Sequence, residues 1–482
     1  MEFDLPFTSM FKESLLKRSF RLLFASIFWF VVYSTSASAI VTDSENTDWD
    51  SVPAILAQIE VPAFPDRDFL VTDFGGVGDG KTDCHAAFQA AIAECADAGG
   101  GRVVAPAGRW FVKCPILLLN NVNLHLEKEA TIAFSTTPQD YLPVVFTRFE
   151  GTELMNYSPL IYAFEKENIA ITGEGVLDGQ AGENKWWNWK GKWDGKNNTG
   201  WTIGKPDQLK DVELLCKMAD EGVRPEERIF GEGHLLRSSF IQTYRSKNVL
   251  IEGVKIINSP MWVINPVLSS NLTIRGVTVD SHGPNNDGCD PESCQNVLIE
   301  NCIFNTGDDC IAIKSGRNHD GRRLATPSED IIIRGCTMKD GHGGVVLGSE
   351  MSGGIRNIFV ENCRMDSPNL ERAIRLKSNS LRGGYLENLF VRNIDVGEVS
   401  EAVLSINLQY WNENGEYFPT VRNIFVENVT SQKSKYPLYL VGLPEQPIDF
   451  VYLKNCKFYN SAQPSVIEHV ERMFFLNVSQ PQ

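Results

Sequence analysis

Basic residues are in the minority in this sequence. In 482 residues, 45 lysines and arginines stand against 61 aspartates and glutamates, which gives a formal net charge of −16. A chain without a basic footprint is not expected to bind nucleic acid. The sequence also lacks His-x-x-Glu-His and paired Cys-x-x-Cys motifs, and their absence argues against a zinc site. Its hydrophobic fraction of 43% and charged fraction of 22% exclude a wholly disordered chain.

Long apolar runs are absent except for one near the N-terminus. Lys17, Arg18 and Arg21 precede an apolar stretch over residues 22–33, and small residues follow as far as Ala39. This order predicts a signal peptide over residues 1–39, with an uncleaved anchor as the alternative. No other run approaches the roughly 18 apolar residues of a membrane span, so stable membrane insertion is not expected. We therefore predict a secreted protein of the extracellular space or cell wall.

Cysteines and glycosylation sequons fit the secretory route. Eleven cysteines cannot all pair within the chain, so at least one is free or linked to another chain. A secreted protein is permitted disulfides, but the sequence does not give their connectivity. Five Asn-x-Ser/Thr sequons predict a glycoprotein, and they stand at Asn156, Asn197, Asn271, Asn428 and Asn477.

One short pattern recurs along the chain. Each copy has a polar residue, alternating apolar positions, an Asn or Gly, and a second alternating run. Alternation of this kind predicts β-strands, and the Asn or Gly suits a bend. The copies begin at Asn168, Asn248, Asn271, Asn296, Asp330, Asn357, Asn388, Asn423 and, one residue out of phase, Phe450.

The spacing of these copies selects the fold class. From Asn248 onward the copies are 23 to 35 residues apart, with no helical pattern between them. A propeller blade needs roughly 40 residues, and the leucine-rich repeat pattern is absent. We therefore predict an all-β protein, a right-handed parallel β-helix in which asparagines at matching positions form hydrogen-bonded ladders.

The predicted β-helix also needs an end cap and defines the domain organisation. Residues 82–98 read as an amphipathic helix, with Thr82 or Asp83 as the cap and Gly99 to stop it. Its apolar face is expected to cover the N-terminal end of the stack. We expect an N-terminal extension over residues 40–66, one β-helix catalytic domain over residues 67–482, and a monomer.

Four polar motifs between residues 284 and 378 stand at about the local repeat spacing. Asp287 and Asp308 are 21 residues apart, and 34 and 33 residues then separate Asp308, His342 and Arg375. We therefore expect each motif to lie one coil beyond the last, on the same face. Asp308 and Asp309 are neighbours in a strand-like run, so both face one cleft only if the chain bends near Gly307. The motifs are Asn285-Asn286-Asp287, Gly307-Asp308-Asp309, Gly341-His342-Gly343 and Arg375-Leu376-Lys377.

Three carboxylates in one patch indicate glycoside hydrolysis. One carboxyl must hold a proton for the leaving oxygen while another takes a proton from water, and mutual repulsion keeps the acid's pKa high. Arg375 and Lys377 would hold an anionic sugar beside the scissile bond.

The same four motifs, in this order, resemble those of the polygalacturonases of glycoside hydrolase family 28. The resemblance runs from about residue 69 to about residue 460 and implies hydrolysis of α-1,4-galacturonosyl bonds in pectin or polygalacturonate with inversion, without a metal or other cofactor. It further implies that Asp308 is the general acid, that Asp287 and Asp309 activate the water, and that His342 supports the acid. Arg375, Lys377 and, from its place in Asn407-Leu408-Gln409-Tyr410, Tyr410 would bind the substrate. The family's usual Thr in the first motif is replaced here by Asn286.

Several alternatives stay open at this point. Within the family the enzyme could instead hydrolyse rhamnogalacturonan or xylogalacturonan, and outside it the fold also serves calcium-dependent pectate lyases and wall-binding proteins. Between Asn168 and Asn248 the interval is 80 residues, so one to two coils' worth of sequence is inserted or irregular there. This interval holds Trp186, Trp187, Trp189, Trp193 and Trp201. They form either a hydrophobic cover or a loop that closes one end of the cleft, and a closed end predicts attack from chain ends.

Overall fold

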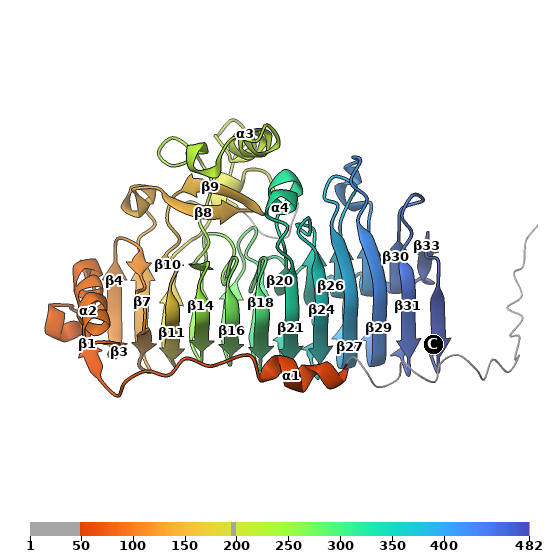
Figure 1. The fold of residues 1–482 in the computed structure, drawn as a ribbon, viewed down its shortest axis with the longest axis horizontal. Coiled ribbons are helices and arrows are strands. Elements are labelled where there is room, and N and C mark those ends of the chain that lie inside the picture. Colours follow the sequence, from red (N-terminus) through yellow and green to blue (C-terminus); the bar gives the residue numbers. More distant parts are fainter. Residues whose placement is uncertain (1–48, 194–198, 482) are drawn as a thin grey trace, which may run out of the picture. The chain divides into compact units, whose positions relative to one another are not determined.

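Strand pairing is almost entirely parallel. The structure is a computed structural model that describes residues 49–193 and 199–481. Each coil adds its strands beside those of the previous coil, which gives the right-handed parallel β-helix that the sequence predicts (Figure 1). Among the named strands of the described residues, only the hairpin β8 (Val145–Phe149) and β9 (Thr152–Asn156) pairs antiparallel.

All nine copies of the sequence repeat are strands of one parallel ladder. β11 pairs directly with β14, with Ile169 opposite Val249, although 80 residues separate them. The long interval is therefore one coil that carries an insertion, and it adds no further coil. The ladder consists of β11 (Glu167–Gly173), β14 (Lys247–Glu252), β16 (Ser270–Arg275), β18 (Gln295–Glu300), β21 (Ser328–Arg334), β24 (Ile355–Glu361), β27 (Tyr385–Glu398), β29 (Thr420–Lys433) and β31 (Asp449–Lys454).

The asparagine that begins most copies has a structural reason. Asn248 and Asn271 have φ angles of 57° and 55°, a left-handed conformation that Asn adopts more readily than most residues. The Asn271 amide donates to Asn248 Oδ1 at 3.0 Å, and the Asn248 amide donates to Asn168 Oδ1 at 2.9 Å, so the predicted ladder is present. The last copy corrects the expected phase: Phe450 has φ 58° and follows the register of Asn423, so it is in phase.

Two further sets of strands complete the coils. The first continues the main sheet after the bend: β4 (Gly108–Val112), β7 (Ala130–Phe134), β12 (Val176–Asp178), β15 (Lys255–Ile257), β17 (Thr278–Ser281), β19 (Ile303–Thr306), β22 (Thr337–Met338), β25 (Arg364–Met365) and β32 (Lys457–Phe458). The second forms separate sheets: β5 (Ile116–Leu117), β10 (Ile161–Phe164), β13 (Ile241–Tyr244), then β20 (Ile311–Ile313), β23 (Val345–Gly348), β26 (Arg372–Lys377), β28 (Ala402–Asn407), β30 (Tyr436–Val441) and β33 (Val466–Glu468).

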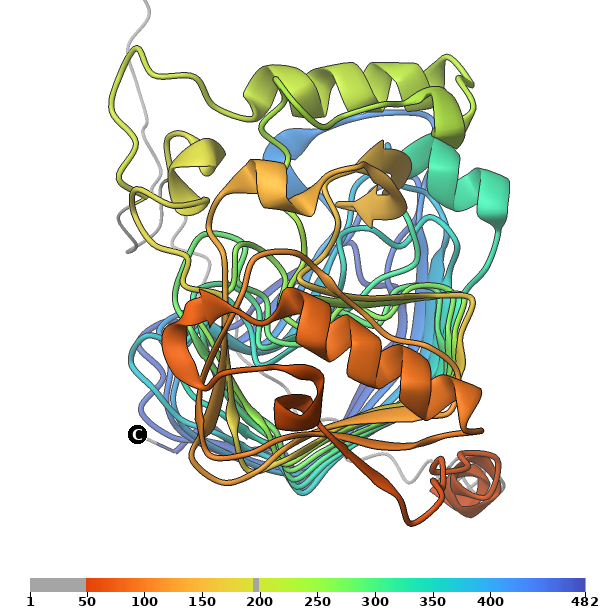
Figure 2. The ribbon, with the colours of Figure 1, turned by 90° about the vertical axis from the view of Figure 1, so that its left-hand side faces the viewer.

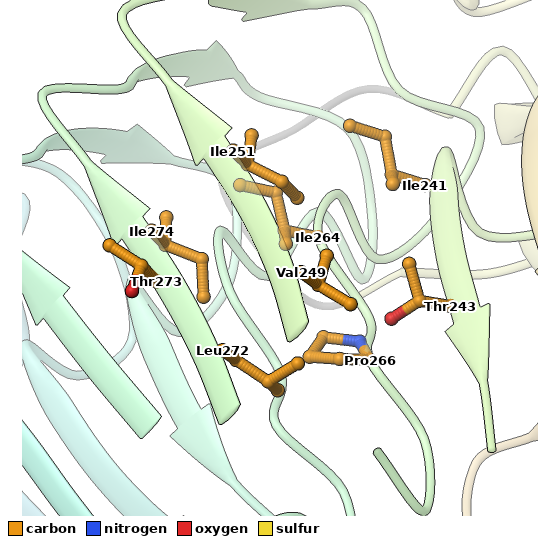
Figure 3. Close-up of a pocket in the computed structure, with 9 residues that line it drawn as sticks. All are labelled: Ile241, Thr243, Val249, Ile251, Ile264, Pro266, Leu272, Thr273 and Ile274. Carbon is orange, nitrogen blue, oxygen red and sulfur yellow. The ribbon is translucent and has the colours of Figure 1, made fainter. Parts of the chain in front are cut away.

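Stacked apolar side chains fill the interior of the coils. Val249 lies opposite Leu272, and Ile251 lies opposite Ile274, in adjacent parallel strands (Figure 3). A void of about 10 Å³ remains among them. A space of that size holds at most about one water molecule, so this region is packed core and no ligand site.

A helix covers the N-terminal end of the stack, as expected, but it begins later than predicted. α2 (His85–Asp97) lies across the first coils in Figure 2, and Phe88, Ala91, Ile92 and Cys95 are its buried face. Residues expected in its first turn belong to β2 (Asp79–Asp83), which pairs with β4. Cys84 takes the N-cap position, and no side chain caps the helix.

Segments outside the coils lie on two sides of them. α3 (Leu209–Asp220), α4 (Asn318–Leu324) and the β8–β9 hairpin lie on one side, and α1 (Val52–Leu56) lies on the opposite side (Figures 1 and 2). α1 belongs to the predicted extension, and its Val52 and Ile55 pack against Phe359 and Phe390 of the sheet. Residues 1–39 lie outside the described residues, so the signal peptide and the domain boundaries stay predictions.

Most of the cysteines and the asparagine of one sequon are buried in the fold. All eleven cysteines are free, and nine of them are buried. Asn156 is 2% exposed and donates to the Leu236 carbonyl, so a glycan at this sequon is incompatible with the folded chain. In the part of the chain that the structure describes, no helix has the length and apolar character to cross a membrane.

Candidate active site

Three carboxylates meet where two neighbouring coils leave the main sheet. Asp308 and Asp309 lie between β19 and β20, and Asp287 precedes Cys289, which pairs with Ile311 of β20. All three are buried, and one oxygen of each lies within 4.8 Å of the others. This convergence matches the patch that the motif spacing predicts.

A bend brings both neighbouring aspartates to the same place. The Thr306 hydroxyl donates to the Asp308 carbonyl at 2.8 Å, and the Asp309 amide donates to the Asp308 carboxylate at 2.9 Å. The Gly307 amide donates to the Ser281 carbonyl on the previous coil. These bonds turn the chain before β20 begins, so Asp308 and Asp309 do not alternate as strand residues would.

His342 forms a close pair with Asp308. Its Nδ1 lies 3.0 Å from Asp308 Oδ1, and its backbone amide donates to the Asp308 carbonyl. The Asp308 charge raises the pKa of His342 to about 9, although burial opposes the rise. Burial also acts to raise the pKa of Asp308, but the charge and hydrogen bond of His342 outweigh it and hold that pKa below 3.8. His342 and Asp308 together therefore carry one titratable proton at neutral pH.

Arg375 and Lys377 reach the cluster by a different route from the predicted one. Arg375 of β26 lies opposite Val346, so it is four residues past the position that faces His342. Its long side chain still brings Nη1 within 3.4 Å of Asp309, and Lys377 Nζ lies 2.7 Å from the same carboxylate. Burial acts to raise the pKa of Asp309, but these two cations hold it below 3.8. Asp309 is thus ionised at neutral pH, as Asp308 is.

Tyr410 lies beside the two cations. It begins η6 (Tyr410–Asn412), and its ring centre is 5.3 Å from Lys377 Nζ and 5.6 Å from the Arg375 guanidinium. A tyrosine ring over these charges restricts them to the side of the cleft that faces Asp309. All seven residues expected in the site thus lie in one connected group.

Sequence reasoning missed a buried lysine and two further carboxylates. Lys314 Nζ lies 3.5 Å from Asp287, 3.4 Å from Asp290 and 3.7 Å from Glu350. Burial and the Asp290 charge raise the pKa of Asp287 well above 3.8, and burial raises that of Asp290 to about 8. Both shifts favour a proton on the Asp287–Asp290 pair, while the Lys314 charge opposes it. The strand register could have indicated this lysine. Lys314 stands three residues after β20 begins and pairs with Glu292 on the previous coil.

The departure at Asn286 has a structural explanation. Its side-chain oxygen accepts from the Ser281 hydroxyl at 2.6 Å and the Gly283 amide at 2.9 Å. Its amide donates to the Ser259 and Met261 carbonyls, each at 3.2 Å. A threonine hydroxyl has a single proton to donate, so it could not satisfy both carbonyls. The substitution holds the loop that presents Asp287.

The tryptophans of the inserted segment divide into two groups. Trp186 is 2% exposed and packs against Tyr141, Tyr157 and Trp189, so it acts as the predicted cover. Trp193 instead stacks on His342, with ring centres 6.0 Å apart and planes inclined by 21°. The insertion therefore also reaches His342, beside the carboxylate cluster.

The carboxylate cluster also has the geometry to hold a cation. The oxygens of Asp287, Asp308 and Asp309 lie close enough together to ligate one metal ion. Lys377 already neutralises Asp309, and Lys314 neutralises Asp287, which supplies the charge compensation that a metal would otherwise provide. The prediction that no metal takes part therefore needs its own test.

Comparisons with known proteins agree on one family. The profile described as "Glycosyl hydrolases family 28" matches residues 234–473, and that of "Rhamnogalacturonase A/epimerase, pectate lyase-like" matches residues 69–128. A hyperthermoactive exopolygalacturonase from Thermotoga maritima has a crystal structure that is 48% identical in sequence, with a TM-score of 0.87 over 90% of this chain and 96% of that chain.

Two curated relatives are more distant. A probable polygalacturonase of Vitis vinifera is 28% identical over 82% of this chain and 74% of its own length. An exo-poly-alpha-D-galacturonosidase of Dickeya chrysanthemi is 26% identical over 83% of this chain and 67% of its own length. With a carboxylate cluster on a right-handed parallel β-helix and these relatives, the chain belongs to glycosyl hydrolase family 28 and is a glycoside hydrolase.

Proposed function

We propose that the enzyme hydrolyses α-1,4-galacturonosyl bonds of polygalacturonate with inversion, and that it works from chain ends. The observation that carries the substrate assignment is the pair Arg375 and Lys377 beside the three carboxylates. In a chain of net charge −16, two buried cations at this point favour a sugar that itself bears a carboxylate. The names of the Thermotoga, Vitis and Dickeya relatives support the same substrate.

The site residues divide the chemistry among them. Asp308 acts as general acid and gives its proton to the glycosidic oxygen as the bond from that oxygen to the anomeric carbon breaks. A water oxygen bonds to the anomeric carbon from the opposite face, and Asp309 takes the proton that this water releases. Asp287 helps to hold the water. Arg375, Lys377 and Tyr410 hold the uronate next to the scissile bond.

The charges within the site support His342 as the source of the proton that Asp308 donates. Asp308 by itself is a poor proton store, because His342 holds its pKa low. The Asp308–His342 pair as a unit does carry a proton, on a histidine whose pKa is about 9. Transfer from His342 Nδ1 to Asp308 Oδ1, 3.0 Å away, would recharge the acid as the leaving oxygen takes the proton.

The inserted segment supports attack from chain ends. Trp187 donates to the Ser259 carbonyl at 2.8 Å, on the coil before the one that carries Asp287, and Trp193 stacks on His342. The insertion thus occupies the N-terminal side of the cluster, where an internally bound polymer would have to continue. Viscosity and reducing-end release on polygalacturonate test this. Monomer release at nearly constant viscosity is expected, and a steep early fall in viscosity with mixed oligomers would show internal attack.

A variant of the stacking tryptophan tests the role of the insertion more directly. Trp193→Ala is expected to raise the KM for polygalacturonate about fivefold or more, because loss of a stacked aromatic costs about 1 kcal/mol or more. Trp201→Ala is the matched control, since Trp201 lies in the same insertion and its indole donates only to the Lys205 carbonyl. Equal effects of the two variants would contradict a role for Trp193 in the cleft.

Other pectic polymers remain the alternative substrates. The match of residues 69–128 to the rhamnogalacturonase and epimerase profile is compatible with rhamnogalacturonan hydrolysis. Product analysis on polygalacturonate, rhamnogalacturonan and xylogalacturonan separates these activities. Preference for either branched polymer would overturn the assignment to polygalacturonate.

The cellular location and the oligomeric state of the enzyme are also proposed. We propose secretion to the extracellular space or cell wall, where pectin lies, and action as a monomer. A cleaved N-terminus after residue 39 in secreted protein, and a monomer mass in solution, would support the two proposals.

A further inference from the structure

Lys314 lies opposite one carboxylate but pairs with others. Its backbone pairs with Glu292 on the previous coil, so both side chains leave the sheet on the same face, with their coils roughly 4.8 Å apart. A lysine and a glutamate in this register are expected to form an ion pair. Among the residues that the structure describes, no ion pair joins Lys314 to Glu292. Lys314 Nζ instead lies within 3.4–3.7 Å of Asp287, Asp290 and Glu350.

Arg148 of the β8–β9 hairpin is the ion-pair partner of Glu292. Its Nη1 lies 3.3 Å from Glu292 Oε1, and both side chains are fully buried. Neither Glu292 oxygen has a hydrogen-bond partner in the described part of the chain, so this guanidinium is the main counter-charge of Glu292. Burial raises the pKa of Glu292, and Arg148 opposes the rise more strongly than Lys314 does. The hairpin therefore supplies the charge that the strand register would take from Lys314.

The other carboxylate near Arg148 has partners of its own. Glu153 Oε1 lies 3.8 Å from Arg148 Nη2, farther away than Glu292. Glu153 also accepts hydrogen bonds from the Tyr244 hydroxyl and, at 2.5 Å, from Arg323 of α4. Loss of the Arg148 charge would therefore leave Glu153 compensated. Glu292 would be left with Lys314, which is the next cation that acts on it.

Lys314 binds one oxygen of Asp287 and leaves the other open. Its Nζ lies 3.5 Å from Asp287 Oδ2. Asp287 Oδ1 is buried and has no hydrogen-bond partner among the described residues. A carboxylate that is held at one oxygen presents the other in a fixed direction, and a water that attacks the anomeric carbon needs an acceptor that is aligned in this way.

We propose that Arg148 is a positioning residue for hydrolysis: because it occupies Glu292, Lys314 is free to hold Asp287 beside the attacking water. The proposal rests on the proposed function, in which Asp287 helps to hold that water. Arg148 acts through two other side chains, Glu292 and Lys314. The position of the hairpin and the geometry of the catalytic cluster are thereby linked by charge.

Arg148→Met tests the proposal, because it removes the charge and keeps most of the length of the side chain. Glu292 should then draw Lys314 away, so kcat on polygalacturonate should fall about tenfold or more as the water loses an aligned acceptor. KM should change less than about twofold, because no group that binds the sugar is altered. Addition of Glu292→Gln to the same chain should return kcat to within about threefold of wild type, since nothing then competes for Lys314.

Arg323→Met is the matched control for disturbance of the hairpin. Arg323 pairs with Glu153 and Asp320, and it has no ion pair with Glu292 in the described part of the chain. Its Tm should fall while its kcat stays within about twofold of wild type. If Arg148→Met does not fold, Arg148→Lys takes its place. The shorter ammonium holds Glu292 less well, so kcat should fall about threefold, and Glu292→Gln should restore it.

Either of two results would overturn the proposal. One is a folded Arg148 variant with the kcat of wild type, and the other is a reduced kcat that Glu292→Gln does not restore. A loss of kcat in Arg323→Met equal to that in Arg148→Met would also overturn it, because that variant disturbs the hairpin without freeing Glu292. Failure of the proposed function is recognised separately, because the wild type itself would then not hydrolyse polygalacturonate.

Discussion

Replacement of His342 by glutamine tests how the acid obtains its proton. A rise of the His342 pKa from 6.5 to about 9 corresponds to roughly 3 kcal/mol of net interaction of the charged imidazole with the fold, of which the Asp308 charge is the largest part, at 1.36 kcal/mol per pH unit. Both side chains are largely buried, with 27% and 10% exposed, so solvent screens this interaction little. His342→Gln should lower kcat on polygalacturonate by about 10²-fold or more, because the proton donor to Asp308 is lost.

The raised pKa of His342 also determines how kcat and folding stability should change with pH. The folded-state pKa of His342 is raised, so the stabilisation is complete below pH 6.5 and is lost as pH rises through about 9. Wild-type kcat should therefore fall as pH rises through about 9, and this limb should be absent from the pH–rate profile of His342→Gln. The variant should be about 3 kcal/mol less stable at pH 6 and nearly as stable as wild type at pH 10.

Thermal unfolding measures the stability difference. An entropy of unfolding near 2.1 cal/mol/K per residue over roughly 430 folded residues makes 3 kcal/mol equal to about 3–4 °C in Tm. His234→Gln is the matched control, because His234 Nδ1 lies 2.8 Å from Asp211 in a similar pair outside the carboxylate cluster. A wild-type alkaline limb that persists in His342→Gln, or a Tm difference independent of pH, would refute the proposed proton path.

Three further predictions test the other parts of the site. Asp308→Asn should lower hydrolysis of polygalacturonate by about 10³-fold or more, because an amide cannot donate an acidic proton; turnover within tenfold of wild type would assign the acid elsewhere. Lys377→Ala should lower kcat/KM by about 30-fold or more and move the acidic limb of the pH–rate profile upward, because Asp309 loses the largest charge that lowers its pKa; Lys433→Ala is the control, and an unmoved limb would contradict the pairing. EDTA should leave activity unchanged and products should lack the ultraviolet absorbance of an unsaturated uronate; loss of activity with recovery on added calcium would favour the lyase alternative.

The sequence by itself determined the coils. Alternation with period two marks every strand of the main ladder from β11 to β31, and it requires no knowledge of neighbouring strands because side chains of a strand alternate between two faces. The asparagines that begin the copies also report a local property, since the left-handed conformation depends on the residue's own side chain. Their recurrence every 23 to 35 residues from Asn248 onward then implies stacking, and the four motifs at about that spacing imply one patch.

Local signals were weaker where packing decides the outcome. The helix over residues 82–98 was expected from its apolar face, and that face is buried as expected, yet Asp79–Asp83 pairs with β4 and delays the start of α2. A strand pairing over more than twenty residues is not visible in a helical pattern. The phase of Phe450 was wrong for another reason: Phe450 stands five residues before Asn455, as Asn423 stands five before Asn428, so the sequence already contained the register that the strands adopt.

Only the tertiary structure decided how the site is charged and closed. Arg375 stands four residues past the position facing His342, and its reach to Asp309 depends on side-chain length and on the bend before β20. The raised pKa of Asp287 and Asp290 comes from burial, and Lys314, which approaches from the next coil, opposes the rise. Trp193 reaches His342 across about 150 residues of chain. These are contacts between coils, and a sequence specifies them only through the fold that brings the coils together.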